Sequence, residues 1–201
     1  MNFQKLLDSE IEKIKDNKIK PRLLLHACCG PCSSYVIEYL SKYFDITIYY
    51  YNPNTYPRLE YVRRLDELNK FINNFNNSVK VIEENYEPNE FYNTIKGLEH
   101  LGEKSERCYK CYELRLNKSA MYAKNNNYDY FTTTLSISPY KNADWINEIG
   151  KELEDKIGIK YLYSDFKKKN GYKRSIELSK KYDMYRQEYC GCVYSKQERE
   201  K

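Results

Sequence analysis

Seven cysteines are gathered into three short groups along this chain of 201 residues. The groups are Cys28/Cys29/Cys32, Cys108/Cys111 and Cys190/Cys192. An odd number of cysteines at such short spacings is not typical of the disulfide framework of a secreted protein. In a reducing compartment, clustered thiols bind metal ions or carry out redox chemistry instead. The cysteines therefore predict a metal or redox centre that is assembled from distant parts of the chain.

Three kinds of centre fit these spacings. The tetrapeptide Cys29-Gly30-Pro31-Cys32 matches the active-site motif of thioredoxin-like enzymes, which predicts thiol–disulfide exchange through Cys29 and Cys32. Two pairs of cysteines also fit a tetrahedral zinc site in a module that binds nucleic acid without catalysis. Four thiols fit an iron–sulfur cluster, and three then remain for a second metal ion or a reactive thiol. Spacing alone does not choose among soft metals.

Strands and helices alternate along the chain and must position these cysteines. Strand-like runs occupy 22–29, 46–51, 79–82, 130–137 and 159–163. Helical spacing of apolar residues occurs at 33–43, 58–74, 90–96, 109–125, 145–157 and, as the last helix, 175–182. This alternation predicts a doubly wound α/β fold with a mostly parallel sheet of about five strands. We expect a single domain over 1–201, with a helical extension at 1–20 and an irregular, cysteine-containing tail from Met184.

The first cysteine group lies where the first predicted strand meets a helix that Pro31 opens. Open α/β sheets bind ligands at the carboxyl ends of their strands, and the amides of a helix N-terminus favour thiolates. We therefore expect Cys28, Cys29 and Cys32 to line a ligand crevice. His26 lies inside the strand, where neighbouring residues point to opposite faces, so it is interpreted as a hydrogen-bonded core histidine.

Positive charge is concentrated at the C-terminal end. The formal net charge is +5, and residues 165–201 carry 11 basic and 6 acidic side chains, whereas the rest of the chain is balanced. The cations predicted to contact RNA phosphates are Lys167, Lys168, Lys169, Lys173 and Arg174. Four nearby tyrosines are able to stack on bases: Tyr172, Tyr182, Tyr185 and Tyr189. A solvated helix face is the alternative interpretation of the same pattern.

Membrane residence is not expected for this chain. The mean hydropathy is −0.88, and no apolar run approaches the roughly 18 residues that a membrane-spanning helix requires. The first 20 residues alternate charged and apolar side chains, which is unlike a signal peptide. We therefore expect a cytoplasmic protein.

Five motifs in this order resemble one known family. They are HACCGPCSS (26–34), YNPNTYPRLEYVRR (51–64), RCYKCYELRL (107–116), FTTTLSISPYKN (131–142) and YCGCVYS (189–195). Together they resemble the cobalamin-independent epoxyqueuosine reductases of the QueH type over about residues 20–195. The resemblance implies a nucleotide-α-hydrolase-like fold. It also implies an oxidoreductase that converts epoxyqueuosine to queuosine at the tRNA wobble position. The electrons for this reaction are expected to come from a low-potential electron donor.

The resemblance further implies a [4Fe–4S] cluster beside a second metal ion, for which iron is favoured and zinc is the alternative. On this basis we expect Cys29, Cys108, Cys111 and Cys192 to bind the cluster. Cys28, Cys32 and Cys190 are expected to hold the second ion, with Cys28 and Cys32 as catalytic residues. The expected substrate contacts are Asn52, Tyr56, Arg64, Ser136, Ser138 and Lys141. One departure is the segment 97–106, which lacks the Gly-Gly stretch of the family motif.

Overall fold

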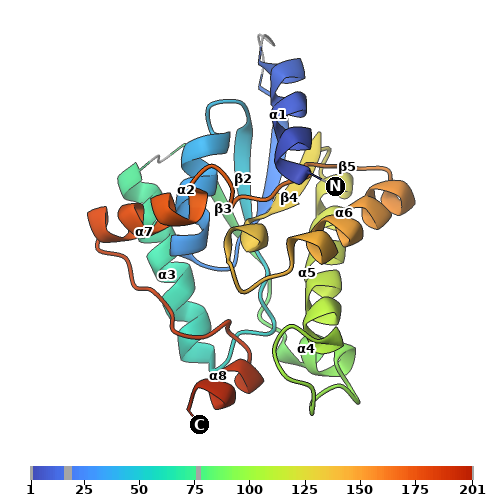
Figure 1. The fold of residues 1–201 in the computed structure, drawn as a ribbon, viewed down its shortest axis with the longest axis vertical. Coiled ribbons are helices and arrows are strands. Elements are labelled where there is room, and N and C mark those ends of the chain that lie inside the picture. Colours follow the sequence, from blue (N-terminus) through green and yellow to red (C-terminus); the bar gives the residue numbers. More distant parts are fainter. Residues whose placement is uncertain (1, 16–19, 76–77, 201) are drawn as a thin grey trace.

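Five parallel strands form the central sheet in the order β3-β2-β1-β4-β5 (Figure 1). Their bounds are β1 Arg22–His26, β2 Asp45–Tyr50, β3 Lys80–Glu83, β4 Tyr130–Thr133 and β5 Lys160–Tyr161. The computed structural model describes residues 2–15, 20–75 and 78–200. The expected α/β class with about five parallel strands is confirmed, and within the described residues every strand pairing is parallel.

The strands are connected and covered by helices. In the described part of the chain these are α1 Phe3–Ile14, α2 Gly30–Leu40, α3 Arg58–Phe75, α4 Pro88–Thr94, α5 Glu106–Asn125, α6 Ala143–Ile157, α7 Gly171–Lys181 and α8 Val193–Arg199, with a 3₁₀ turn η1 at Thr134–Ile137. Among these residues no helix is both long enough and apolar enough to cross a bilayer.

Alternate residues of the strands face two separate cores. Leu23 and Leu25 of β1 pack with apolar residues of α1, α2, α3 and α7, whereas Leu24 between them packs with those of α5 and α6. The two helical layers lie on opposite sides of the sheet in Figure 1. The period of two along a strand therefore accounts for the doubly wound arrangement. Leu7 and Ile11 of α1 belong to the first core, so this predicted extension is integral to the packing.

The predictions for two segments were wrong. The strand expected at 130–137 ends at Thr133, because the Thr133 hydroxyl accepts a hydrogen bond from the Leu135 amide and starts the 3₁₀ turn. The tail expected to be irregular from Met184 contains α8, so the helix at 175–182 is not the last. At its start the Cys192 sulfur accepts a hydrogen bond from the Ser195 amide. The helix has only seven residues, which is too short for a clear apolar period.

The order of the strands creates a crevice at one edge of the sheet. The chain builds outward from β1 through β2 to β3 and then returns to the other side of β1 to form β4. At such a switch point the connections after β1 and β4 diverge and leave space for a ligand. Gly30 begins α2 here, where a Cβ atom would lie only 3.3 Å from the carbonyl oxygen of Glu67 on α3. The tight packing of these two helices thus explains the glycine in the CGPC motif.

Candidate metal centre and substrate pocket

Cys28, Cys29 and Cys32 bring three sulfur atoms together at the start of α2. The three Sγ atoms lie within 4.8 Å of one another, and the Sγ atoms of Cys28 and Cys29 are 3.7 Å apart. Thiolates bound tetrahedrally to a metal ion at ~2.3 Å lie about 3.8 Å from one another. The donor type and the sulfur separations therefore fit a soft metal ion.

The protonation of the three thiols is strongly unequal. Hydrogen bonds from Cys29 and Cys32 hold the pKa of Cys28 well below its usual range. Burial raises the pKa of Cys29 to about 12, and the hydrogen bond with Cys28 raises the pKa of Cys32. These hydrogen bonds favour ionisation of Cys28 over ionisation of its two neighbours. Ionising all three requires a compensating positive charge at this place.

Lys141 supplies positive charge to the same group of sulfurs. Burial by itself would lower the pKa of this ammonium, but the sulfurs of Cys190, Cys28 and Cys32 hold it above its ordinary value. No ion pair with a carboxylate is found for Lys141 within the described ranges. Its charge therefore acts on the thiols.

Arg115 supplies a second charge from α5. Its NH1 lies 4.0 Å from the sulfur of Cys111 one helical turn earlier, and its NH2 donates to Asn52 Oδ1 at 2.7 Å. The amide nitrogen of Asn52 donates in turn to the carbonyl of Ala27 at 2.9 Å. Asn52, expected to contact substrate, therefore connects Arg115 to the turn that carries the first cysteines.

A cavity connects the three cysteine groups. Four of the seven cysteines line it: Cys32, Cys108, Cys190 and Cys192. Cys28 and Cys29 are buried next to Cys32, and Cys111 shares a small apolar cluster with Cys192 and Phe91. All seven cysteines are free thiols. The structure thus brings the three groups, far apart in the sequence, to one crevice.

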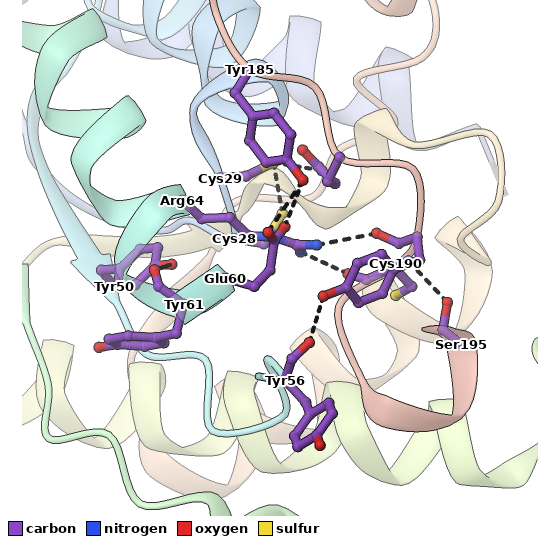
Figure 2. Close-up of polar contacts among 12 residues, drawn as sticks. Cys28, Cys29, Tyr50, Tyr56, Glu60, Tyr61, Arg64, Tyr185, Cys190 and Ser195 are labelled. Atoms are coloured by element: carbon purple, nitrogen blue, oxygen red, sulfur yellow. Dashed lines mark hydrogen bonds and ion pairs between the residues drawn. The ribbon is translucent and has the colours of Figure 1, made fainter. Parts of the chain in front are cut away.

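Arg64 on α3 holds the loop that carries the last cysteines, as Figure 2 shows. Its Nε donates to Glu60 at 2.7 Å, and its NH1 and NH2 donate to the carbonyls of Cys190 at 3.0 Å and Tyr189 at 3.2 Å. Gly191 has φ +137°, and a Cβ atom there would lie 2.9 Å from Arg64 NH1. Only glycine therefore lets the loop approach the guanidinium this closely.

The other expected substrate residues take different places. The carbonyl of Tyr56 accepts a hydrogen bond from the Tyr189 hydroxyl, and the side chain of Tyr56 is partly exposed. Ser136 is fully buried, with its hydroxyl 3.2 Å from that of Ser164. Of the six residues expected to contact substrate, the ones that line the cavity are Ser138 and Lys141.

His26 lies outside the cysteine site. Its Nδ1 is 2.8 Å from the hydroxyl of Thr133, and its Nε2 is 3.1 Å from the carbonyl oxygen of Tyr51. Burial lowers its pKa to about 3, so the ring is neutral at physiological pH. Because the Tyr51 carbonyl can only accept, Nε2 carries the proton. The interpretation of His26 as a hydrogen-bonded core histidine is confirmed.

Two residues near the sulfurs, Gln187 and Arg115, were not identified from the sequence. Gln187 Nε2 donates to the sulfur of Cys29 at 3.0 Å, and the Thr134 hydroxyl lies 3.9 Å from the sulfur of Cys28. Gln187 reaches Cys29 because the segment after α7 runs along α3, where the Tyr185 amide donates to Glu67 and its hydroxyl to Glu60. No local sequence pattern predicts such a contact. The contact of Arg115 with Cys111 was predictable from the sequence, since residues four apart on one helix are neighbours.

Most of the basic residues expected to contact RNA have acidic partners. Lys167 pairs with Asp165 at 3.0 Å, Lys169 with Asp8 at 2.6 Å, and Arg174 with Glu38 at 2.7 Å. Lys168 and Lys173 are exposed and have no ion pair among the described residues.

A doubly wound, all-parallel α/β sheet with a thiol-lined crevice at its switch point defines a cysteine-rich α/β protein suited to metal binding. The family model described as "Epoxyqueuosine reductase QueH" matches residues 23–198. The chain belongs to this family. It is 42% identical over 199 residues to the epoxyqueuosine reductase QueH of Streptococcus pyogenes serotype M1, covering 97% of this chain and 78% of that one.

Similar agreement is found with two other relatives of the same name. The protein of Staphylococcus epidermidis is 45% identical over 201 residues, covering 97% of this chain and 84% of the relative. The protein of Thermotoga maritima is 37% identical over 178 residues, covering 88% of this chain and 91% of the relative. The family resemblance expected from the five motifs is therefore confirmed.

Proposed function

We propose that this protein is an epoxyqueuosine reductase that converts epoxyqueuosine to queuosine at the wobble position of tRNA. The observation that carries the proposal is the convergence of three cysteine groups on one cavity at the switch point of the sheet. Conversion of the epoxide to an alkene consumes two electrons and two protons and releases one water molecule. The names of the relatives agree with this reaction.

We propose that two metal centres share the seven thiols. A [4Fe–4S] cluster is assigned to Cys29, Cys108, Cys111 and Cys192, and a second ion, iron or alternatively zinc, to Cys28, Cys32 and Cys190. The geometry supports the second set, because Cys32 and Cys190 line one cavity and Cys28 is buried beside Cys32. When bound, the two centres supply electrons from a low-potential donor and a Lewis acid for the epoxide oxygen.

The cavity residues position the substrate around these sulfurs. Lys141 places a positive charge where the departing oxygen gathers negative charge, and a fixed cation there stabilises the transition state. Ser138 lines the same cavity and offers a hydroxyl to the substrate. Cys28 and Cys32 are the proposed catalytic residues. Arg64 and Asn52 act indirectly, since both bind backbone groups that lead to the cysteines.

Several broader features complete the proposal. We assign the chain to the nucleotide-α-hydrolase-like folds, which the strand order and the helices on both faces support. Residues 1–201 form a single domain of a cytoplasmic protein, whose basic C-terminal segment, 165–201, completes the metal site. The α7 side contacts tRNA through Lys167, Lys168, Lys169, Lys173 and Arg174, and the exposure of Lys168 and Lys173 supports this most directly.

A bacterium that lacks its own epoxyqueuosine reductase provides a direct test. Expression of the wild-type chain should restore queuosine in its tRNA, whereas the Cys32→Ala variant should leave epoxyqueuosine. Anaerobic purification separates the alternatives. Iron with acid-labile sulfide supports the reductase, stoichiometric zinc alone supports the nucleic-acid-binding module, and a colourless protein with a reversible Cys29–Cys32 disulfide supports thiol exchange.

A further inference from the structure

Three residues from distant segments meet at the mouth of the cavity. Lys104 precedes α5, Tyr140 lies between η1 and α6, and Arg199 is at the end of α8. All three line the cavity that also contains the cysteines. The Tyr140 side chain is 57% exposed, and its ring centroid lies 6.0 Å from Lys104 Nζ and 5.7 Å from Arg199 Cζ. We refer to Lys104, Tyr140 and Arg199 as the rim.

We infer that the rim binds the single-stranded tRNA nucleotides on either side of the modified one. The inference rests on the proposed function. A nucleotide that enters the cavity remains covalently joined to its two neighbours, so the residues at the mouth must meet those neighbours. Single-stranded RNA is bound by stacking bases on aromatic side chains and by placing cations beside the phosphates. Tyr140 provides the ring, and Lys104 and Arg199 provide the charges.

The charges at the mouth are available to a ligand. Neither Lys104 nor Arg199 has an ion pair with any residue in the described part of the chain. Lys169 and Arg174 near α7, by contrast, already pair with Asp8 and Glu38. The rim cations can therefore bind phosphates without first breaking an internal salt bridge.

The whole cavity has an excess of positive side chains. Its lining includes four cations, Lys104, Lys141, Arg186 and Arg199, against two carboxylates, Glu103 and Glu188. Glu103 accepts a hydrogen bond from the Ser195 hydroxyl, so it is held within the protein. An exposed aromatic ring, flanked by cations that have no carboxylate partner among the described residues, matches the chemistry of an anionic strand with exposed bases.

Binding of an anticodon stem-loop RNA to the metal-loaded protein tests the inference, with the affinity measured over a range of salt concentrations. Tyr140→Ala should weaken binding about tenfold, because one base loses its stacking partner. The salt dependence should remain that of the wild type. Tyr140→Phe keeps the ring and should bind as the wild type does.

Replacing the two cations of the rim, unlike replacing Tyr140, should change the salt dependence of binding. Lys104→Ala with Arg199→Ala should reduce the slope of log K against log salt by about 0.7 for each phosphate contact that is lost. A matched double variant of exposed lysines on α6, Lys151→Ala with Lys156→Ala, should leave the slope unchanged. Wild-type affinity and slope in all the rim variants would overturn the inference.

Activity on epoxyqueuosine-containing tRNA separates this inference from the proposed function. If the rim variants bind and react as the wild type does, the rim inference fails while the reductase function stands. If the wild-type protein binds the stem-loop through the rim but leaves the epoxide intact, the RNA site stands while the reductase function fails.

Discussion

The guanidinium of Arg64 donates a hydrogen bond to the backbone carbonyl of Cys190, 3.0 Å away and 126 residues later in the chain. This contact joins α3 to the loop of the last two cysteines, while Glu60 and the carbonyl of Tyr189 accept hydrogen bonds from two further N–H groups of the guanidinium. Arg64 is only 2% exposed. Its role is therefore to place the Cys190 thiol near those of the β1–α2 turn.

Replacing Arg64 should separate the loop from the rest of the site. Arg64→Lys keeps the charge but loses the planar fork that reaches three acceptors. We expect lower metal content per protein and a loss of stability of about 1–3 kcal/mol, because the carbonyls of Cys190 and Tyr189 lose their donors at a buried site. Iron analysis and thermal unfolding measure the two effects. Arg63, the adjacent exposed residue, serves as the control, and Arg63→Lys should change neither the metal content nor the stability. Equal effects of the two substitutions would contradict the role of Arg64 in placing the loop of Cys190.

Substitution of individual cysteines should remove different metal centres, depending on which centre each thiol binds. Cys111→Ala or Cys108→Ala should remove most of the cluster absorbance, since each opens an iron coordination position. Cys32→Ala should preserve much of that absorbance and abolish turnover. Cys29→Ala tests how the adjacent residues Cys28 and Cys29 are divided between the cluster and the second ion. Loss of the cluster supports the proposed assignment, whereas selective loss of the second ion would place Cys29 with Cys28 and Cys32.

Gln187 should influence the reduction potential through its contact with Cys29. Hydrogen bonds to ligand sulfurs stabilise the more negative, reduced state of a cluster. Gln187→Leu removes the donor, so we expect the potential to fall by about 40 mV, the equivalent of one ordinary hydrogen bond. A redox titration followed by optical absorbance gives the value. Glu188→Asp, which keeps the charge of the adjacent exposed residue, should not shift the potential, and an unchanged potential in Gln187→Leu would exclude this role.

The ion pair between α2 and α7 should make stability depend on pH. The hydrogen bond from Arg174 holds the pKa of Glu38 below its ordinary value of 4.5. The pair therefore stabilises the fold above that value, and the contribution is lost as the pH falls through the lower, folded-state pKa. Arg174→Ala should cost roughly 0.5 kcal/mol near pH 7 and nothing in acid, because the pair is partly exposed. Denaturant unfolding at several pH values measures this difference, and a cost independent of pH would exclude the ion pair as its source.

Much of the fold follows from local patterns, because buried parallel strands have continuous apolar runs and surface helices have an apolar stripe. The run at 130–137 shows the limit of such patterns. Threonine favours strands, but the hydroxyl of Thr133 binds the next turn and ends β4. The seven-residue helix α8 depends on the chain around Cys192 and leaves almost no periodic signal.

The site was predictable where its chemistry is carried by a residue type and unpredictable where it depends on tertiary contacts. The cysteines indicate a metal centre because thiols at short spacing have few other uses. Arg64 has no comparable signature. Its position near the cysteines suits substrate binding, yet its guanidinium is used within the protein. Gln187 comes to Cys29 only when the C-terminal segment packs along α3.

The proposed function requires that the thiol-lined cavity reduces the epoxide of epoxyqueuosine in tRNA. The most direct measurement incubates the anaerobically reconstituted protein with a low-potential reductant and epoxyqueuosine-containing tRNA, without cobalamin, and follows the digested nucleosides by mass spectrometry. We predict that the modified nucleoside loses one oxygen atom with the wild-type protein and keeps it with Cys28→Ala. An intact epoxide in the presence of a full cluster and several electron donors, together with reduction of protein disulfides through Cys29 and Cys32, would contradict the claim.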